Sequence, residues 1–242
     1  MPDPVLTDFS SIPERPTKAS VLQACTLLNP LTEAQREDLI ESSFMAYAER
    51  GELIWHAGSP AEYAAIIGVG FIKMTKLNPS GQEMAVELLG PGQCLGLMVV
   101  LEGRSFPLSA LAATHCWYMK ASARNLIAAY QANDKLKDQV VRNLGPRLRR
   151  AHDMMSRLSS GKVEQRIAAI LFILADSYGA RNGHAINIQV PLTRQDIAEM
   201  AGTTTETSIR VLSKWQKEGV VATDKHLISI LDEAKLTEVM SQ

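Results

Sequence analysis

Hydrophobic residues recur at two different spacings along the chain. Between residues 44 and 119, short apolar runs alternate with glycine, proline, serine and asparagine. Strands of roughly four to eight residues bounded by such turns predict an antiparallel barrel or jelly roll. Outside this stretch the spacing is about three to four residues, which is typical of helices. We expect helices at residues 19–28, 32–42, 121–131, 134–159 and 163–178.

Residues 192–221 predict two short helices joined by a tight turn. Thr193 is a candidate N-cap of the first helix, and Gly202 stands where a left-handed backbone costs least. Thr203 or Thr204 can cap the second helix. Residues 220–231 then predict a small hairpin, or wing, after Gly219. The second helix has helically spaced apolar residues that we expect to be buried: Ile209, Val211, Leu212 and Trp215.

Glu206 and Arg210 are four residues apart on the second helix and therefore share a face, together with Thr203 and Lys214. The major groove of DNA admits one α-helix, where an arginine can bond bidentately to guanine and a carboxylate can accept from cytosine. Glu206 can also hold Arg210 in an extended position. The simpler alternative is a solvated ion pair on an ordinary helix.

The stretch resembles the DNA-binding domain of the cyclic-AMP receptor protein/FNR (Crp/Fnr) family, whose pattern is T-R-x-D/E-I-A/G-x-x-x-G-x-S/T-x-E-T-x-x-R-x-L. The matches in one register are Thr193, Arg194, Asp196, Ile197, Ala198, Gly202, Thr204, Glu206, Thr207, Arg210 and Leu212. The cyclic-AMP receptor has an arginine where this chain has Thr205. In the family that position, with the glutamate and the second arginine, reads a TGA-type half-site.

The resemblance, which covers residue 20 to the end, implies a winged helix-turn-helix that binds double-stranded DNA as a homodimer and contacts RNA polymerase. Residues expected to read bases are Thr204, Thr205, Glu206 and Arg210. Residues expected to contact phosphates are Thr193, Arg194, Gln195, Thr207 and Lys225. The fold class expected is α+β, with an N-terminal β jelly-roll effector domain like the cyclic-nucleotide-binding fold, a long dimerisation helix and a C-terminal winged helix-turn-helix.

Four segments follow from these patterns: a flexible arm (1–18), a β-roll sensor domain (19–132), a dimerisation helix with its hinge (133–160) and the DNA-binding domain (161–242). The long helix has an apolar stripe that predicts a coiled-coil seam between two copies. Pro146 predicts a kink near residues 142–146. The expected seam consists of Leu136, Val140, Leu144, Leu148, Ala151, Met155 and Leu158.

Composition narrows the class of protein without identifying a ligand. The 242 residues are 46% hydrophobic and 21% charged, with a net charge of −1, so charge alone does not predict nucleic-acid binding. No apolar run reaches the roughly 18 residues of a membrane span, and no secretory signal is evident. We expect a cytoplasmic protein that makes no membrane contact. Metal-ligand clusters, nucleophile motifs and phosphate loops are not evident in the sequence, so an enzyme is not expected.

The effector is less well defined than the DNA-binding domain. Cyclic-AMP binders of the family have a glutamate after a glycine and, about ten residues on, an arginine followed by serine or threonine. Here Leu97 follows Gly96 in place of the glutamate. Arg104-Ser105 matches the arginine–serine pair, but at a shorter spacing. In another register the arginine position falls on Phe106. The positions that contact adenine fall on Ala151 and His152, so cyclic AMP is not the expected effector.

Of the two iron-containing cofactors, an iron–sulfur cluster is not expected and haem is an alternative. Cys25, Cys94 and Cys116 cannot by themselves supply the four thiolates of an iron–sulfur cluster, and we expect them to be buried free thiols. Haem stays an alternative through His115, Cys116 and Pro2, although adjacent residues on a strand point to opposite faces. The remaining alternatives are a regulator without a ligand and an effector-binding module whose winged domain contacts protein.

Overall fold

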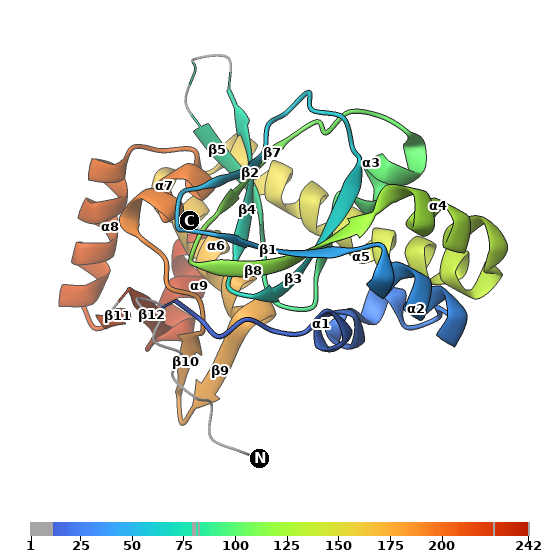
Figure 1. Cartoon of the computed structure of the whole chain (residues 1–242). Helices are drawn as coiled ribbons and strands as arrows, with labels where there is room; N and C mark the ends of the chain where they lie inside the picture. Colours follow the sequence, from blue (N-terminus) through green and yellow to red (C-terminus); the bar gives the residue numbers. More distant parts are fainter. Residues whose placement is uncertain (1–11, 79–80, 82, 225, 242) are drawn as a thin grey trace. The chain divides into compact units, whose positions relative to one another are not determined.

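The computed structural model describes residues 12–78, 81, 83–224 and 226–241; the side chains of residues 150, 153, 154, 156–160 and 241 lie outside the description. The chain divides into two compact units (Figure 1). The first unit comprises residues 1–76 and 87–146, and the second comprises residues 77–86 and 147–242. Each is described separately, and the strands β4 and β5, whose ends within residues 77–86 are grouped with the second unit, are described with their sheet in the first.

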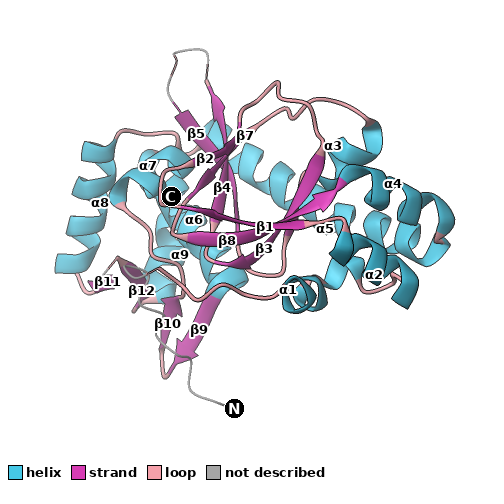
Figure 2. Ribbon diagram, in the orientation of Figure 1, coloured by secondary structure: helices cyan, strands magenta, loops and turns pink. Residues whose placement is uncertain are grey.

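Two four-stranded antiparallel sheets form the centre of the first unit (Figure 2). Their strand orders are β1-β8-β3-β6 and β2-β7-β4-β5. Buried residues of both sheets, such as Ile67, Ile72 and Tyr118, belong to one hydrophobic cluster, so the core lies between the sheets. This is the predicted jelly roll. The strands are β1 (Phe44–Ala48), β2 (Leu53–Trp55), β3 (Tyr63–Val69), β4 (Ile72–Leu77), β5 (Glu83–Leu89), β6 (Cys94–Leu95), β7 (Ser109–Ala112) and β8 (Cys116–Ser122).

Helices cover one side of the first sheet, and their buried residues form a second cluster with it (Figure 2). Thr32 caps α2 through a capping box with Gln35. The short α3 had not been expected. The helices of this unit are α1 (Lys18–Ala24), the 3-10 helix η1 (Thr26–Leu28), α2 (Glu33–Glu41), α3 (Leu97–Glu102), α4 (Ala123–Ala132) and the first part of α5 (Asp134–Ser160).

The segment before α1 is fastened to the β-roll, which corrects the predicted flexible arm for residues 12–18. The indole Nε1 of Trp117 donates to the Pro13 carbonyl at 2.9 Å, and the Arg15 guanidinium lies 5.4 Å from the centre of the Trp117 ring. Lys18 Nζ donates to the Ser43 carbonyl at 3.1 Å and also to that of Ile40. Residues 1–11 of the predicted arm lie outside the described residues.

Gly68 of β3 lies directly under this segment. A Cβ atom at Gly68 would be 2.7 Å from Val21 Cγ2 and 2.8 Å from Pro16 Cγ. Since such distances are shorter than real Cβ contacts, Pro16 of the segment and Val21 of α1 pack on β3 only because position 68 has no side chain.

The long helix α5 requires a correction to the predicted seam. Leu136 and Val140 are buried in the hydrophobic core of their own unit, so they are not free to contact a second copy. Ala151 is exposed, and Leu158 lies among the side chains outside the description. The large apolar side chains exposed along α5 include Val141, Leu144, Leu148 and Met155. Pro146 lies inside the helix, and the kink stays a prediction.

The second unit combines a four-stranded sheet, in the order β11-β12-β10-β9, with four helices and the end of α5. Neither β9 nor α9 was predicted from the sequence. The elements are α6 (Val163–Tyr178), β9 (Gly179–Asn182), β10 (Ala185–Ile188), α7 (Arg194–Ala201), α8 (Thr205–Lys217), β11 (Val221–Asp224), β12 (Leu227–Ile230) and α9 (Glu233–Ser241).

Candidate nucleic-acid interface

Helices α7 and α8 form the predicted helix-turn-helix, and polar side chains fix both starts. Thr193 caps α7, where its Oγ1 accepts from the Asp196 backbone at 3.1 Å and the Asp196 carboxylate accepts from the Thr193 backbone at 2.9 Å. Gly202 ends α7 with φ of 57°, a conformation that glycine adopts at little cost. Of the two candidate caps for α8, Thr204 is the one observed.

Glu206 and Arg210 of α8 do not hold each other. Hydrogen bonds from its own backbone N–H and from the Thr204 hydroxyl lower the pKa of the Glu206 carboxyl, which therefore stays ionised at neutral pH. Among the residues that the structure describes, none forms a hydrogen bond or ion pair with the Arg210 guanidinium. The prediction that Glu206 holds Arg210 is therefore wrong, and the exposed Arg210 side chain is available to an external partner.

The buried side of α8 is made by Ser208, Val211, Leu212 and Trp215. Ile209, which was expected in this group, is instead 46% exposed. The Ser208 hydroxyl oxygen is fully buried without a hydrogen-bond partner among the described residues. A polar residue therefore takes an inward position, and its apolar neighbour is turned outward.

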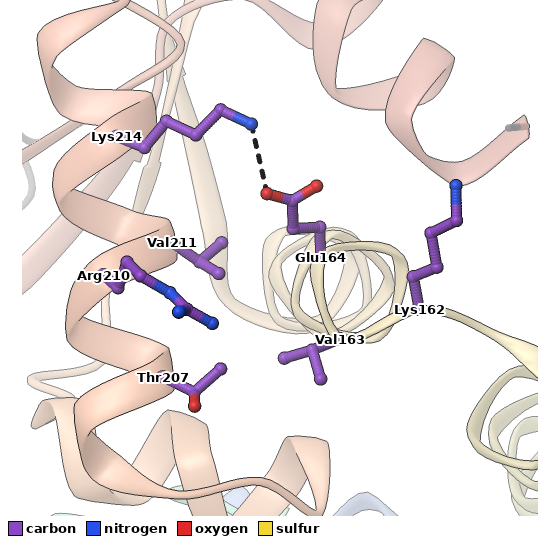
Figure 3. A pocket seen from close by; sticks show the side chains of 7 residues that line it. All are labelled: Lys162, Val163, Glu164, Thr207, Arg210, Val211 and Lys214. Carbon is purple, nitrogen blue, oxygen red and sulfur yellow. Dashed lines mark hydrogen bonds and ion pairs between the residues drawn. The ribbon is translucent and has the colours of Figure 1, made fainter.

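A shallow pocket of about 230 Å³ lies between α8 and the start of α6 (Figure 3). Figure 3 shows Arg210 pointing from α8 into the space between the helices, toward Val163. Across the same space, Lys214 Nζ forms an ion pair with Glu164 Oε1 at 3.1 Å. Lys162 and Thr207 also line the pocket. Glu164 and Lys162 had not been singled out in the sequence, because they are distant from the motif.

Arg166 of α6 donates to two separate backbone segments of the second unit. Its guanidinium donates to the carbonyl groups of Ala201 at 2.8 Å, Gly161 at 2.9 Å and Gly202 at 3.3 Å. It therefore ties Gly161, two residues before α6, to the C-terminus of α7 and to the turn that follows it. One signal in the sequence could have indicated this role, namely an arginine directly before the long apolar run of the helix.

The expected phosphate-contacting residues form local hydrogen bonds around α7. Arg194 Nη2 donates to Thr223 Oγ1 at 3.0 Å, which ties α7 to the wing, and burial lowers the pKa of Arg194. Gln195 Nε2 donates to Glu199 Oε1 at 2.9 Å. Thr207 donates its backbone N–H to Thr204 Oγ1 at 3.3 Å. Lys225, the candidate in the wing, lies outside the described residues.

The candidate effector residues of the first unit differ in burial and in their contacts. Leu97 is buried in a hydrophobic cluster, Gly96 begins α3 with φ of 77°, and Arg104 is exposed near Glu102. Ser105 is exposed and forms an isolated bridge with Pro60. Ala151 and His152, both exposed, belong to the second unit.

Phe106, the alternative arginine position, is buried among aromatic side chains. Its ring stacks on Trp55 at a centroid distance of 4.2 Å and an interplanar angle of 14°. Backbone hydrogen bonds hold it in place, because its N–H donates to the Ser59 carbonyl and its carbonyl accepts from the Gly58 N–H. A Cβ at Gly96 would lie 2.7 Å from Phe106 Cε1. An aromatic side chain therefore occupies the position at which a phosphate-binding arginine was sought.

His115 and Cys116, two of the candidate haem ligands, make different contacts. The His115 ring stacks on Tyr47, and its Nδ1 lies 2.7 Å from the Tyr47 hydroxyl, whereas Cys116 is buried in the core. Pro2 lies outside the described residues. Cys25, Cys94 and Cys116 are free and buried, and burial raises the pKa of Cys25 to about 11 and that of Cys116 to about 12. Among the described residues, no group of three His, Cys, Asp or Glu side chains could hold a metal ion.

Comparison with known proteins identifies both units. Residues 165–239 match the model of the Crp-like helix-turn-helix domain, and residues 46–133 match that of the cyclic nucleotide-binding domain. The chain belongs to the Crp/Fnr family. It is accordingly a DNA-binding transcription regulator and not an enzyme.

Relatives of this Crp/Fnr regulator match it over most of their length. The global nitrogen regulator of Synechococcus elongatus is 26% identical over 195 residues, covering 80% of this chain and 88% of the relative. The CRP-like cAMP-activated global transcriptional regulator of Mycobacterium tuberculosis is 25% identical over 187 residues, covering 77% and 84%. A CRP-family regulator from Thermus thermophilus, of known structure, is 26% identical with a TM-score of 0.66, covering 81% and 97%. In the part of this chain that the structure describes, no helix is long and apolar enough to cross a membrane.

Proposed function

We propose that this regulator acts in the cytoplasm as a homodimer that reads a TGA-like palindrome in double-stranded DNA. The observation that carries the proposal is the exposed Arg210, unpaired among the described residues, beside an ionised Glu206 on a helix with a fixed start. An arginine in this state can bond bidentately to guanine, and a carboxylate can accept from cytosine N4. Thr204 and Thr205 contribute further contacts near the start of the helix.

Phosphate contacts by Thr193, Arg194, Gln195, Thr207 and Lys225 orient the helix in the groove. Such contacts fix register and orientation without specifying sequence. The bond between Arg194 and Thr223 supports this role, because it couples α7 to the wing. RNA polymerase is the expected protein partner at promoters.

Dimerisation through α5 is supported by the exposed Val141, Leu144, Leu148 and Met155. These residues recur at intervals of three, four and seven, so a second copy of the helix can cover them. Two copies of α8 would then enter major grooves about one helical turn apart. The revised seam begins later in the helix than the sequence alone suggested.

An effector other than cyclic AMP, or none, fits the first unit best. The buried Phe106 and Trp55 fill space with rings, and the exposed Arg104 offers no enclosed phosphate site. A ligand that gates DNA binding would have to bind one state of the protein more tightly than the other. A regulator with a vestigial sensor domain is the alternative.

The test is fluorescence anisotropy of wild type and Arg210→Ala on a TGA palindrome and on a scrambled duplex. Loss of a bidentate contact should weaken binding to the palindrome by about 1–3 kcal/mol more than binding to the scrambled duplex. Lys217→Ala is the control, since it removes the same charge from the last turn of α8 and should affect both duplexes equally. Identical curves for Arg210→Ala and wild type would disprove the assignment.

A second function, in which the winged domain contacts protein, is distinguished by the same assay. It is favoured if wild type binds the palindrome and the scrambled duplex with equal, weak affinity. Analytical ultracentrifugation of wild type and Leu148→Lys tests the dimer, because a charge in the seam should shift the protein to monomer. An unchanged dimer would exclude this seam.

A further inference from the structure

Ile209 is an exposed apolar residue of α8, and packing within this protein does not explain its position. The buried side of the helix is complete without it, because Val211, Leu212 and Trp215 are covered. Ile209 nevertheless exposes 46% of its surface, next to Ser208, whose hydroxyl is buried without a partner among the described residues. A helix optimised only for packing would have the opposite arrangement at these two positions.

Helix geometry places Ile209 on the side of α8 that carries the proposed base-reading residues. At about 100° per residue, Ile209 lies about 60° to one side of Glu206, and Arg210 lies about 40° to the other side. The three side chains therefore form one outward arc with the carboxylate in the middle. A surface that presents Arg210 and Glu206 to base edges also presents Ile209.

The chemistry of the major groove gives this apolar group one specific partner. Of the four bases, only thymine carries a methyl group at the groove edge, and proteins read it by apolar contact. Polar base edges and phosphates offer nothing that an isoleucine side chain would recognise. A thymine methyl also loses contact with water when it is covered, which makes the contact favourable.

We propose that Ile209 is a specificity-determining residue that contacts the 5-methyl group of a thymine beside the base pairs read by Glu206 and Arg210. This inference rests on the proposed function, since it requires α8 to enter the major groove. It adds a preference that neither polar residue can supply. It also assigns a role to a residue that the hydrophobic pattern had placed in the core.

The experiment is a uracil scan of the duplex that wild-type protein selects from a random pool. Each thymine is replaced singly by uracil, which lacks only the methyl group, and binding is measured by anisotropy. One thymine per half-site should be sensitive, with affinity about fourfold weaker after replacement, which corresponds to about 0.8 kcal/mol for one buried methyl at 1.4 kcal/mol per tenfold. Replacement in both half-sites should weaken binding roughly fifteenfold.

Three variants assign this sensitivity to Ile209. Ile209→Ser should bind the thymine and uracil duplexes equally, and Ile209→Val should keep most of the discrimination. Leu231→Ser, at a residue that is 42% exposed at the end of β12, should discriminate as wild type does. Thermal melting followed by circular dichroism checks that the variants remain folded.

The outcomes separate this inference from the proposed function. If wild type selects no duplex, the proposed function fails first. If it selects a TGA-like site but tolerates uracil at every position, or if Ile209→Ser keeps the thymine preference, the inference is wrong and the proposed function stands. A uracil-sensitive site that becomes insensitive only in Ile209→Ser supports both.

Discussion

Replacement of Arg166 by alanine should loosen the helix-turn-helix from helix α6. The guanidinium donates three hydrogen bonds, to the carbonyl groups of Ala201, Gly161 and Gly202. Each hydrogen bond to a charged group contributes about 1.5–3 kcal/mol. The bonds at 2.8 and 2.9 Å should each contribute a free energy within this range, and the bond at 3.3 Å should contribute less. Because Arg166 is only half-buried, water can replace part of the loss, and we expect about 3 kcal/mol in the free energy of unfolding.

The arrangement also predicts the effect of lysine at this position. Lysine keeps the positive charge near the C-terminus of α7, where it is favourable, but its compact ammonium cannot match the planar fork of arginine. Arg166→Lys should therefore recover about 1 kcal/mol of the loss. Affinity for specific DNA should be highest for wild type, lower for Arg166→Lys and lowest for Arg166→Ala, because the turn that positions α8 would no longer be held to α6.

The assay is urea unfolding followed by ¹⁹F NMR of protein labelled with 5-fluorotryptophan. Trp215 is buried and is the single tryptophan of residues 147–242, so its signal reports on the second unit. Arg181→Ala is the matched control, since it removes an exposed ion pair with Glu233 and should cost at most about 1 kcal/mol. If Arg166→Ala and Arg181→Ala unfold at the same urea concentration, the bridging role of Arg166 is refuted.

Three further predictions concern buried groups. Ser208→Ala should raise the free energy of unfolding by about 1 kcal/mol, because it removes a buried hydroxyl that has no partner among the described residues; a lower urea midpoint would contradict this. Phe106→Ala should destabilise the first unit by about 3–5 kcal/mol, and indole should raise the melting temperature of the variant but not of wild type; an unaffected variant would argue against the stacking with Trp55. For Cys25 and Cys116, burial raises the pKa values from 9.0 to about 11 and about 12. Since the folded thiols keep protons that the unfolded ones lose, stability should be unaffected by these groups below pH 9 and should fall as the pH rises toward 11 and 12. Melting curves across this range should show a shallower decline for a Cys25→Ala/Cys116→Ala variant.

Local signals in the sequence predicted the helix-turn-helix well. The N-cap hydroxyls of Thr193 and Thr204 and the glycine at position 202 each act through neighbours a few residues away, so spacing alone identifies them. Helix α6 agrees with its predicted bounds because its apolar run is long and continuous. Glycines between the strands of the β-roll, such as Gly58 and Gly92, have positive φ angles, which explains why this residue type marks the turns in the sequence.

Features that depend on distant neighbours could not be predicted in this way. The apolar stripe of α5 shows that something covers Leu136 and Val140, but it cannot say whether that is a second copy or the chain's own core. The inversion of Ser208 and Ile209 contradicts the binary pattern locally. Phe106 meets Trp55 across about fifty residues, and the three acceptors of Arg166 come from two separate turns, so only tertiary structure brings them together.

The contact of the N-terminal segment with Gly68 links residues that would otherwise vary independently in evolution. The backbone angle at this glycine is ordinary, so space alone excludes a side chain there. An alanine at position 68 would push against Pro16 and Val21 at the same time, and displacing them would uncover Trp117. We therefore expect positions 16, 21 and 68 to change together among descendants of this gene, and only a lineage that lost both the segment and the Val21 side chain would have room for a small residue at position 68.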